Sequence, residues 1–432
     1  MKDSPPDHEG SPERCDVVIV GAGAAGLMAG IHAARVLGDS GRVIGLDGAR
    51  RIGMKILVAG GGRCNVTHHQ VRPEDYAGSS QPAIRKVLGR FPVKRTVEFF
   101  EELGVELKQE STGKLFPVTD RAKTVLGALL DAWRDAGAEL RFPRRVESID
   151  FLSPGFHIRG EGTDLIADRV ILTPGGKALP KSGSDGSGYQ LARSLGHTIT
   201  DAVHPALVPL VLRGGSELRD LSGIAAEVGM EVRDGRGRRI AGYAAPLLCT
   251  HFGVSGPVVL DASRHLLAAR LAGDAEAHVI VDWLPDDDRA AFEATLLGSK
   301  GGQTIAGLLR GKLPERMVLT LSMVAGLQAS DRVRGLSREA RGRLLTTLFE
   351  HRIPVEGDRG YTHAEATAGG VPLSEVRLDT MESRKIPGLH LAGEILDVDG
   401  RVGGFNFQWA WASGHLAGTA AAKAGTPQSP KA

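Results

Sequence analysis

The sequence predicts an α/β fold in which a parallel-sheet domain is divided by an insertion of different character. Three observations support this prediction. Residues 16–26 join an apolar strand to a glycine-rich turn. The composition then changes to short β-like runs near residue 201 and to helical sequence near residue 287. Residues 386–394 again read as an apolar strand that ends in glycine, as in the first segment. This recurrence indicates that the intervening residues are inserted into one domain.

The first element is the segment 16–26, Asp-Val-Val-Ile-Val-Gly-Ala-Gly-Ala-Ala-Gly. Its apolar run predicts a buried parallel strand, followed by a tight turn and a helix pressed closely on the sheet. Gly21 permits the turn, Gly23 lets the backbone approach a pyrophosphate, and Gly26 allows close packing. A diphosphate would lie on the unpaired N–H groups of the first helical turn, which begins with Ala24 and Ala25.

The context of the glycines decides between a nucleotide site and a turn that binds nothing. A second predicted strand, residues 42–46, ends at Asp47, about 20 residues past the last glycine. An acid at this distance accepts hydrogen bonds from ribose hydroxyls. With a strand before, a helix after and the acid in place, the segment indicates a Rossmann-type domain that binds a dinucleotide with a free ribose 2′-OH.

Composition limits the classes of function. The chain has 432 residues, with 53 Lys and Arg against 51 Asp and Glu, for a formal net charge of +2. The length suggests about three domains. A nearly balanced charge does not favour nucleic acid or an anionic membrane as a partner. No apolar run is long enough to span a bilayer.

The cysteines and the terminal segments indicate a cytoplasmic protein. Cys15, Cys64 and Cys249 lie far apart and form no C-x-x-C pair, which argues against a disulfide framework or a Cys-rich zinc site. The three acids at 286–288 cannot all face one ion and are expected to begin a helix, so we expect no metal. Residues 1–14 are polar, lack the apolar core of a signal peptide and are expected to be disordered.

These composition changes predict an ordered set of segments. The insertion would comprise a β-rich substrate domain and then a helical subdomain. The expected segments are 1–14 as a tail, 15–200 as the first part of the cofactor-binding domain, 201–286 as the β-rich insert, 287–354 as the helical subdomain, 355–424 as the second part of the cofactor-binding domain, and 425–432 as a disordered tail.

A second glycine cluster follows Asp47. Residues 56–67 read Ile-Leu-Val-Ala-Gly-Gly-Gly-Arg-Cys-Asn-Val-Thr, and consecutive glycines are costly inside a helix or strand. The segment suits backbone held against a planar ligand or phosphate, with charge from Lys55 and Arg63 and hydrogen bonds from Asn65. The alternative is a flexible surface loop.

The C-terminal glycine motif indicates FAD more than NAD. Gly393-Glu394 ends a predicted strand, and a helix is expected to start around Asn406, although alternating aromatic residues at 405–411 alone would indicate a strand. Glu394 would accept a hydrogen bond from a ribityl hydroxyl. The helix after Gly404 would direct N–H groups at the flavin N1–C2=O edge. A second complete glycine fingerprint is absent, so NAD(P)H would act as a transient electron donor.

Several motifs together resemble the BaiN-like family of bacterial flavoproteins, which includes bile-acid double-bond reductases and aminoacetone-oxidase-like proteins. They are ILVAGGGRCNVT (56–67), TPGGKALPKSGSDGSG (173–188), THFGVSGP (250–257), TAGGV (367–371) and GLHLAGEILDVDGRVGGFNFQWAWASG (388–414). The resemblance implies a Rossmann-type FAD-binding domain with an inserted β-barrel-like domain and a small helical subdomain. The sequence departs from the family pattern at Pro174 and has Asp47 where glutamate is common.

The resemblance also implies residue roles. Arg63, Cys64 and Asn65 would lie beside the flavin, and Thr173 and Gly175 would contact the ADP half. For Cys64, a packing role is favoured over a redox-active thiol. The complete set of expected cofactor-binding residues is Gly21, Gly23, Ala24, Ala25, Gly26, Asp47, Lys55, Arg63, Cys64, Asn65, Val146, Thr173, Gly175, Gly393, Glu394, Gly404, Phe405 and Asn406.

The expected activity is FAD-dependent hydride transfer between a small organic substrate and flavin N5. His251 is the candidate proton donor, weighed against a structural role. NAD(P)H-linked reduction of a conjugated double bond and amine oxidation with oxygen both stay open. An RNA-associated flavoprotein is the alternative from another class, disfavoured by the net charge but supported by the Arg-rich segment 332–352. A flavin-binding scaffold without activity is a third hypothesis, and the oligomeric state is open.

Overall fold

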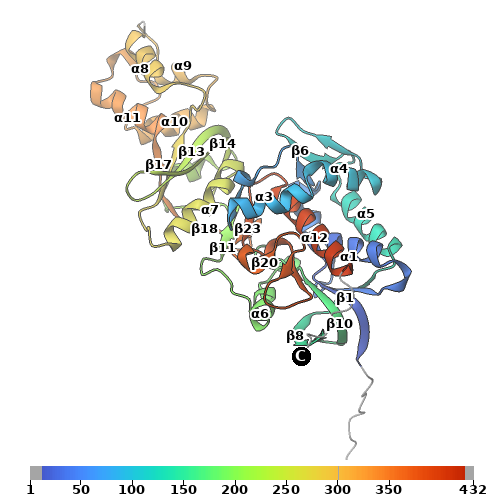
Figure 1. Cartoon of the computed structure of the whole chain (residues 1–432). Coiled ribbons are helices and arrows are strands. Elements are labelled where there is room, and N and C mark those ends of the chain that lie inside the picture. Colours follow the sequence, from blue (N-terminus) through green and yellow to red (C-terminus); the bar gives the residue numbers. More distant parts are fainter. Residues whose placement is uncertain (1–11, 300, 424–432) are drawn as a thin grey trace, which may run out of the picture. The chain divides into compact units, whose positions relative to one another are not determined.

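The computed structural model describes residues 12–299 and 301–423, which form two compact units (Figure 1). Unit 1 contains the described residues up to Val203 and those from Gly369 onward, and unit 2 runs from His204 to Ala368. Each unit has its own hydrophobic core. The chain therefore leaves unit 1 once and returns to it, as the interrupted pattern of the sequence predicts.

The described part of unit 1 is built on one sheet of nine strands, in the order β20-β21-β22-β10-β1-β2-β7, with the β8–β9 hairpin attached to β10. The strands β22, β10, β1, β2 and β7 run parallel. Their bounds are β1 Glu13–Val20, β2 Val43–Leu46, β7 Glu139–Arg141, β8 Val146–Leu152, β9 Gly155–Gly160, β10 Thr163–Leu172, β20 Val376–Arg377, β21 Glu382–Ser383 and β22 Leu389–Leu391.

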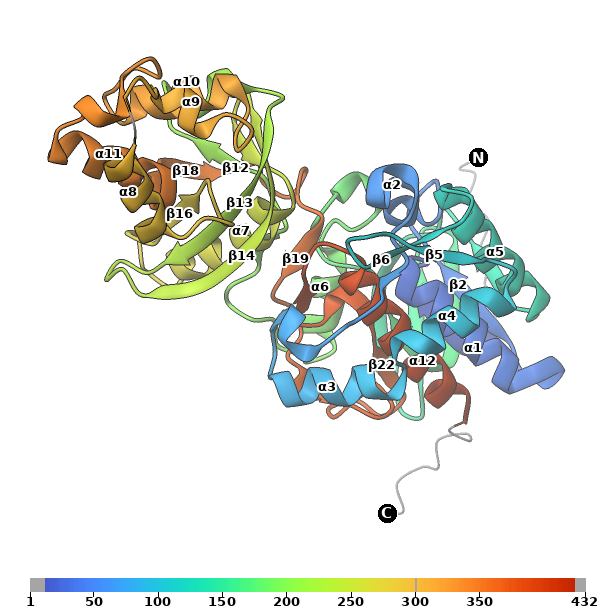
Figure 2. The same ribbon diagram turned by 90° about the horizontal axis from the view of Figure 1, so that it is seen from above.

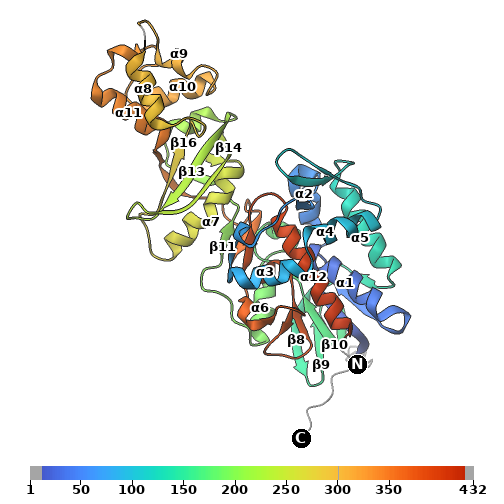
Figure 3. The same cartoon turned by 45° about the horizontal axis from the view of Figure 1, so that its top comes forward.

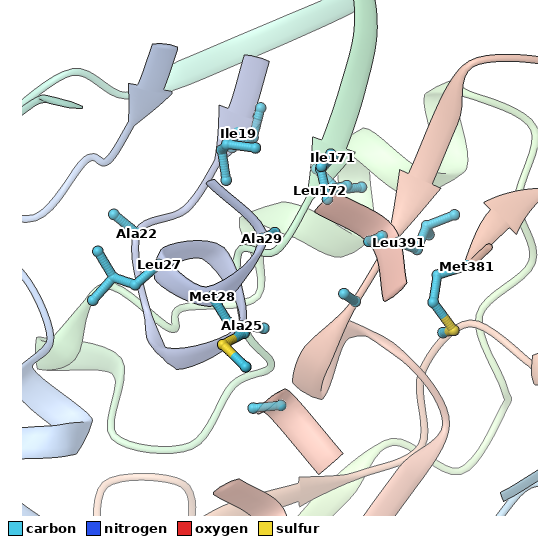
Figure 4. Close-up of a cluster of buried hydrophobic side chains, with 14 of the residues drawn as sticks. Ile19, Ala22, Ala25, Leu27, Met28, Ala29, Ile171, Leu172, Met381 and Leu391 are labelled. Atoms are coloured by element: carbon cyan, nitrogen blue, oxygen red, sulfur yellow. The ribbon is translucent and has the colours of Figure 1, made fainter. Parts of the chain in front are cut away.

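The centre of this sheet is buried under helices. Figure 4 shows Ile19 of β1, Ile171 of β10 and Leu391 of β22 in the same hydrophobic cluster as Leu27 and Met28 of α1, and all five side chains are buried. Such apolar runs are expected for parallel strands covered on both faces. The helices of unit 1 are α1 Ala24–Leu37, α2 Met54–Gly62, α3 Gln81–Arg90, α4 Val93–Glu102, α5 Ala122–Asp135, α6 Ser187–Ser194 and α12 Phe405–Lys423.

Two small sheets complete unit 1. In one, β6 lies between β3 and β5, and in the other β4 pairs with β23. The second pairing joins residues near position 77 to residues near position 399, so it ties the N-terminal and C-terminal parts of the unit together. The bounds are β3 Thr67–His68, β4 Tyr76–Gly78, β5 Leu107–Gln109, β6 Lys114–Pro117 and β23 Val398–Gly400.

The helices α1 and α12 lie side by side in unit 1 (Figure 3). A β-carbon added to Gly414 would overlap the carbonyl oxygen of Ala25, and one added to Gly418 would overlap that of Ala29. The same four-residue step on both helices means that they run parallel. Glycine at these two positions is required because the backbones themselves are in contact.

Unit 2 contains an antiparallel sheet in the order β17-β16-β13-β14-β15-β12-β18, and a two-stranded sheet of β11 and β19. Figure 2 shows the helices α8–α11 gathered together in this unit. The bounds are β11 His204–Ala206, β12 Leu210–Leu212, β13 Ala225–Arg233, β14 Arg239–Thr250, β15 Gly253–Ser255, α7 Pro257–Leu271, β16 His278–Asp282, α8 Arg289–Gly298, α9 Ile305–Leu309, α10 Glu315–Val324, α11 Arg338–Phe349, β17 His351–Ile353, β18 Val355–Asp358 and β19 Ala366–Ala368.

A single hydrophobic core joins the sheet and the helices of unit 2. It includes Val281 of β16, Leu266 of α7, Met317 of α10 and Leu345 of α11. The β-rich and helical parts of the insertion therefore stabilise each other by sharing buried apolar surface.

The structure differs from the sequence expectations at three places. Residues 201–286 were expected to form a series of β-like runs, but they also contain the helix α7. Its helical pattern is hard to recognise in the sequence, because buried Asp261 and Arg264 interrupt the apolar positions. Residues 355–368 belong to unit 2, because β18 pairs with β12 and β19 with β11. Glu13 and Arg14, expected in the tail, pair with β10 as part of β1.

Other parts of the expected tails lie outside the described residues: these are 1–11 and the whole of 425–432. Among the helices of residues 12–299 and 301–423, none combines the length and apolar character needed to cross a bilayer.

The contact between α1 and α12 predicts that Gly418→Ala lowers the free energy of unfolding by about 1–3 kcal/mol, because the added methyl group forces the two backbones apart. Gly127→Ala in α5 is the matched control, since a β-carbon there meets nothing within 4 Å. The control should be neutral or slightly stabilising. Urea unfolding followed by tryptophan fluorescence measures both variants, and equal stability of the two would contradict the close helix contact.

Candidate functional site

The candidate site lies at the carboxyl ends of the parallel strands of unit 1. Backbone hydrogen bonds join the residues that follow four neighbouring strands: Gly21 N donates to Leu46 O at 2.8 Å, Thr173 N to Val20 O at 2.9 Å, and Ala392 N to Leu172 O at 3.1 Å. Ligands of open α/β sheets bind at this edge. The glycine turn, Asp47, Thr173 and Gly393, predicted separately from the sequence, therefore lie at one edge.

The turn 21–26 leaves the start of α1 open. Gly21 has a φ of 100°, and a β-carbon on Gly26 would overlap the carbonyl oxygen of Gly21. Thr173 closes the turn by donating its hydroxyl to Gly21 O at 2.7 Å. Around Gly23, by contrast, an added β-carbon meets nothing within 4 Å, and no side chain caps the helix. The first N–H groups, including those of Ala24 and Ala25, can therefore receive an anion.

Asp47 shapes this turn as well as facing the site edge. Its Oδ2 accepts from Ala22 N and its Oδ1 from Ala49 N, both at 2.7 Å. Burial raises the pKa of the Asp47 carboxyl, opposed by these two hydrogen bonds. A carboxylate oxygen accepts more than one hydrogen bond, so the group retains acceptor capacity for ribose hydroxyls.

Lys55 and Glu394 form an ion pair between α2 and the segment after β22. Lys55 Nζ lies 2.5 Å from Glu394 Oε2, with side chains 24% and 21% exposed. Gly393, with a φ of 79°, is fixed on both sides, donating to Ser413 Oγ at 3.0 Å and accepting from Trp409 Nε1 at 3.1 Å. Glu394 is therefore a positioned acceptor near the N-terminus of α1.

The start of α12 is a second open helix N-terminus. Gly403 and Gly404 have φ values of 127° and 93°, and a β-carbon on Gly404 would lie 2.6 Å from the backbone of Thr67. The carbonyl of Phe405 accepts from Tyr76 Oη at 2.8 Å, and the Asn406 side chain bonds the N–H and carbonyl of Gly400. The first turn contains no acidic residue. Its N–H groups are thus held ready for an electron-rich ligand edge.

The two open N-termini point the same way, because α1 and α12 run parallel. Gly414 lies level with Ala25, so α12 begins nine residues before this level. At 1.5 Å per residue the two helix starts are offset by about 12 Å along the helix direction. Two positive helix ends at this offset fit one extended molecule that carries a diphosphate near its middle and an electron-rich ring at one end. The residues present therefore fit FAD.

The glycine segment 60–62 is neither a regular helix nor a featureless loop. Gly60, Gly61 and Gly62 have φ values of 56°, 70° and 85°, which ends the helical part of α2 in left-handed backbone. Arg63 donates to Glu110 Oε1 at 2.6 Å, and its guanidinium lies 4.0 Å from the Phe116 ring centroid. The charge of Arg63 is therefore already paired in this structure.

Cys64 and Asn65 follow in buried positions. Cys64 has a φ of 62°, and burial raises the pKa of its thiol to about 12. The thiol stays protonated at neutral pH, which supports a packing role. The Oδ1 atom of Asn65 is buried with no hydrogen-bond partner among the described residues. A buried acceptor without a hydrogen-bond partner destabilises the protein. Asn65 Oδ1 is therefore a candidate to accept a hydrogen bond from a ligand.

The remaining expected residues fall into two groups. Val146 is buried at the start of β8, and Gly175 has a φ of 79° with Ser184 Oγ only 2.7 Å from where a β-carbon would lie. His251 lies in unit 2, exposed on the turn between β14 and β15, where its carbonyl accepts from Arg219 Nε at 2.8 Å. Of the predicted site residues, His251 alone lies outside unit 1.

Sequence patterns missed the residues that hold the site backbone. Tyr76 fixes the first turn of α12, and Ser413 and Trp409 fix Gly393. Their partners are main-chain atoms of distant residues, so no local motif marks Tyr76 or Ser413.

Within the described residues, no group of three or more His, Cys, Asp or Glu side chains is placed to hold a metal ion.

Comparison with known proteins establishes the family. The family described as HI0933-like protein Rossmann domain matches residues 15–420. The chain belongs to this family. It is similar to a 3-dehydro-bile acid delta(4,6)-reductase of Clostridium scindens, with 37% identity over 414 residues, covering 94% of this chain and 98% of the relative. The match confirms the predicted BaiN-like membership and Rossmann-type fold class.

Other relatives carry a different name. A ribosomal RNA dihydrouridine synthase of Escherichia coli is 31% identical over 93% of this chain and 96% of its own length, and one of Haemophilus influenzae is 29% identical over 92% and 96%. Among solved structures, a 3-ketosteroid delta1-dehydrogenase of Sterolibacterium denitrificans in complex with 1,4-androstadiene-3,17-dione has 14% identity and a TM-score of 0.50, covering 95% of this chain and 99% of that chain. That likeness concerns the fold. The family membership and this fold identify the chain as an FAD-dependent oxidoreductase.

The open start of α1 predicts that Gly23→Val gives folded but colourless protein. The φ of −79° at Gly23 suits valine and the space around it is empty, so the side chain displaces a diphosphate without disturbing the fold. Flavin absorbance and circular dichroism of the purified variant measure the two properties. Gly26→Ala is the contrast, expected to lose stability itself. A yellow Gly23→Val protein at full occupancy would refute the assigned position of the diphosphate.

Burial of Cys64 predicts that iodoacetamide leaves this thiol unmodified in the native protein at neutral pH, because the thiolate forms near its raised pKa of about 12. Peptide mass spectrometry measures the labelling, and the protein unfolded in urea serves as the labelled control. Cys64→Ala should retain flavin and its reducibility. Loss of flavin reduction in that variant would restore the redox-active alternative.

Proposed function

We propose that the chain uses NAD(P)H to reduce a carbon–carbon double bond conjugated to a carbonyl group. The observation that carries this proposal is the pair of parallel, open helix N-termini, one placed for a diphosphate and one for the electron-rich edge of a flavin. The names of the relatives support the reaction class. A 3-dehydro steroid with a Δ4 double bond and a uracil ring both have a C=C next to a carbonyl, and both named reactions saturate such a bond.

The residues of this chain have distinct tasks in the proposal. The first turn of α1 binds the diphosphate, Asp47 accepts from the ribose, and Glu394, held by Lys55, accepts from the ribityl chain. The N–H groups at the start of α12 stabilise negative charge at the N1–C2=O edge. FAD, when bound, exchanges hydride at its N5 atom. Because these groups are fixed by Tyr76, Ser413 and Asn406, they are oriented before the reaction begins.

The nicotinamide cofactor would bind transiently and would not occupy a dinucleotide-binding domain of its own. The described sheet of unit 1 provides one glycine fingerprint at its edge, and Gly183, Gly186 and Gly188 occur in an order that does not match a second one. Hydride would therefore arrive from NAD(P)H in one half-reaction. In the other it would pass to the β-carbon of the conjugated double bond, and a proton from an acid or from water would complete the saturated bond at the α-carbon. The assignment of His251 as proton donor stays a prediction.

An anaerobic two-step assay tests the function. NADPH or NADH should bleach the flavin absorbance, and added 2-cyclohexenone should restore it, because hydride attacks a carbon activated by the conjugated carbonyl. Cyclohexene, which lacks the carbonyl, is the matched control and should leave the flavin reduced. Bleaching by amines but not by NAD(P)H, with peroxide formed on admission of oxygen, would replace this proposal by the amine-oxidase alternative.

A further inference from the structure

A group of arginines on the helical part of unit 2 forms no ion pair within the described residues. Arg332, Arg334 and Arg338, here called the arginine surface, lie on the turn before α11 and at its first residue, and all three are exposed. In residues 12–299 and 301–423, none of the three side chains forms an ion pair or a hydrogen bond. The guanidinium groups of the arginine surface are thus exposed to solvent and unpaired within the described residues.

Two acids lie beside these arginines in the sequence, Asp331 and Glu339, and within the described residues neither forms an ion pair with them. The carboxylate of Asp331 accepts from Gln328 N at 2.8 Å. Hydrogen bonds with its own backbone N–H and with Ser337 lower the pKa of Glu339, and the charges of Arg343 and Arg341 contribute. Both carboxylates stay charged, but residues 331–343 carry five arginines against these two acids, so the segment is positive on balance.

Three exposed arginines elsewhere in unit 2 are paired. Arg238 lies 2.7 Å from Asp234, Arg289 lies 2.5 Å from Glu350, and Arg352 lies 3.6 Å from Glu276. The chain as a whole is nearly neutral, with 53 bases and 51 acids. The expectation against a polyanionic partner relied on this overall balance, but a local field depends on which charges are paired.

We propose that the arginine surface binds the phosphate backbone of an RNA whose pyrimidine is the reduced substrate. This inference rests on the proposed function, because a uracil ring contains the required C=C conjugated to a carbonyl. Guanidinium groups match phosphate oxygens in a planar, two-point geometry. The two relatives named ribosomal RNA dihydrouridine synthases support RNA as the occupant.

The apolar side chains within this segment favour RNA over a membrane. Val333 and Leu336, which alternate with the arginines, are buried in the core of unit 2. A membrane-binding surface combines basic residues with exposed apolar anchors. The arginine surface offers charge alone, which suits contacts to phosphates that position a nucleic acid.

A charge-matched pair of variants tests the proposal in the holoenzyme without turnover. One variant is Arg332→Gln, Arg334→Gln and Arg338→Gln, and the control is Arg238→Gln, Arg289→Gln and Arg352→Gln, which removes the same charge from paired positions. Filter binding measures the affinity for deproteinised ribosomal RNA over a series of salt concentrations. The first variant should bind roughly tenfold or more weakly, with a salt slope reduced by about two to three, whereas the control should resemble wild type.

Three outcomes would overturn the RNA surface. They are no RNA binding by the wild type at low salt, an equal loss in both triple variants, and binding to phosphatidylglycerol vesicles in place of RNA. Reduction of 2-cyclohexenone by NADPH should be unchanged in both variants. Failure of that reaction in the wild type would contradict the proposed function independently of any result with RNA.

Discussion

The contact between α1 and α12 is the constraint on which the site depends. Gly414 and Gly418 bring the backbone of α12 against Ala25 and Ala29. A larger residue at either glycine would move the start of α12 relative to the start of α1. The N-terminus of each helix attracts negative charge. The distance between the two helices therefore determines whether one ligand can contact both N-termini. Two segments almost four hundred residues apart in sequence thereby become one binding surface.

Several expected ligand-binding residues also hold the protein itself. Asp47 ties Ala22 and Ala49 together, and Thr173 donates to the carbonyl of Gly21, so both shape the glycine turn before any nucleotide arrives. Lys55 and Glu394 hold each other. This preorganisation lowers the entropy lost on binding. A substitution of Asp47 would therefore change both the turn and the proposed ribose contact. A substitution of Gly23 would affect only ligand binding, because the space around it is empty.

Sequence reasoning predicted the candidate site from residues that directly follow predicted strands. Gly21, Asp47, Thr173 and Gly393 each follow an apolar strand, and parallel strands align their carboxyl ends. It could not find α7, whose buried polar residues hide the helical period, or the strands near residues 355 and 366, which are short and gain their pairing from distant partners. Tyr76 and Ser413 were also out of reach, because their role is to bond backbone that only folding brings near.

A second polar cluster in unit 1 contains residue types common in active sites, but its polar atoms are already hydrogen-bonded within the protein. Ser383 Oγ lies 2.9 Å from His197 Nε2, and His197 Nδ1 lies 2.7 Å from Glu375, the order of groups in a hydrolase triad. Yet Ser383 is 2% exposed, and its oxygen accepts from Lys385 N and Ile386 N at 3.0 Å. Its lone pairs are used by the turn it stabilises, so it cannot attack a substrate. The open starts of α1 and α12 are the opposite case, since their first N–H groups are held in place and donate to no partner within the described residues.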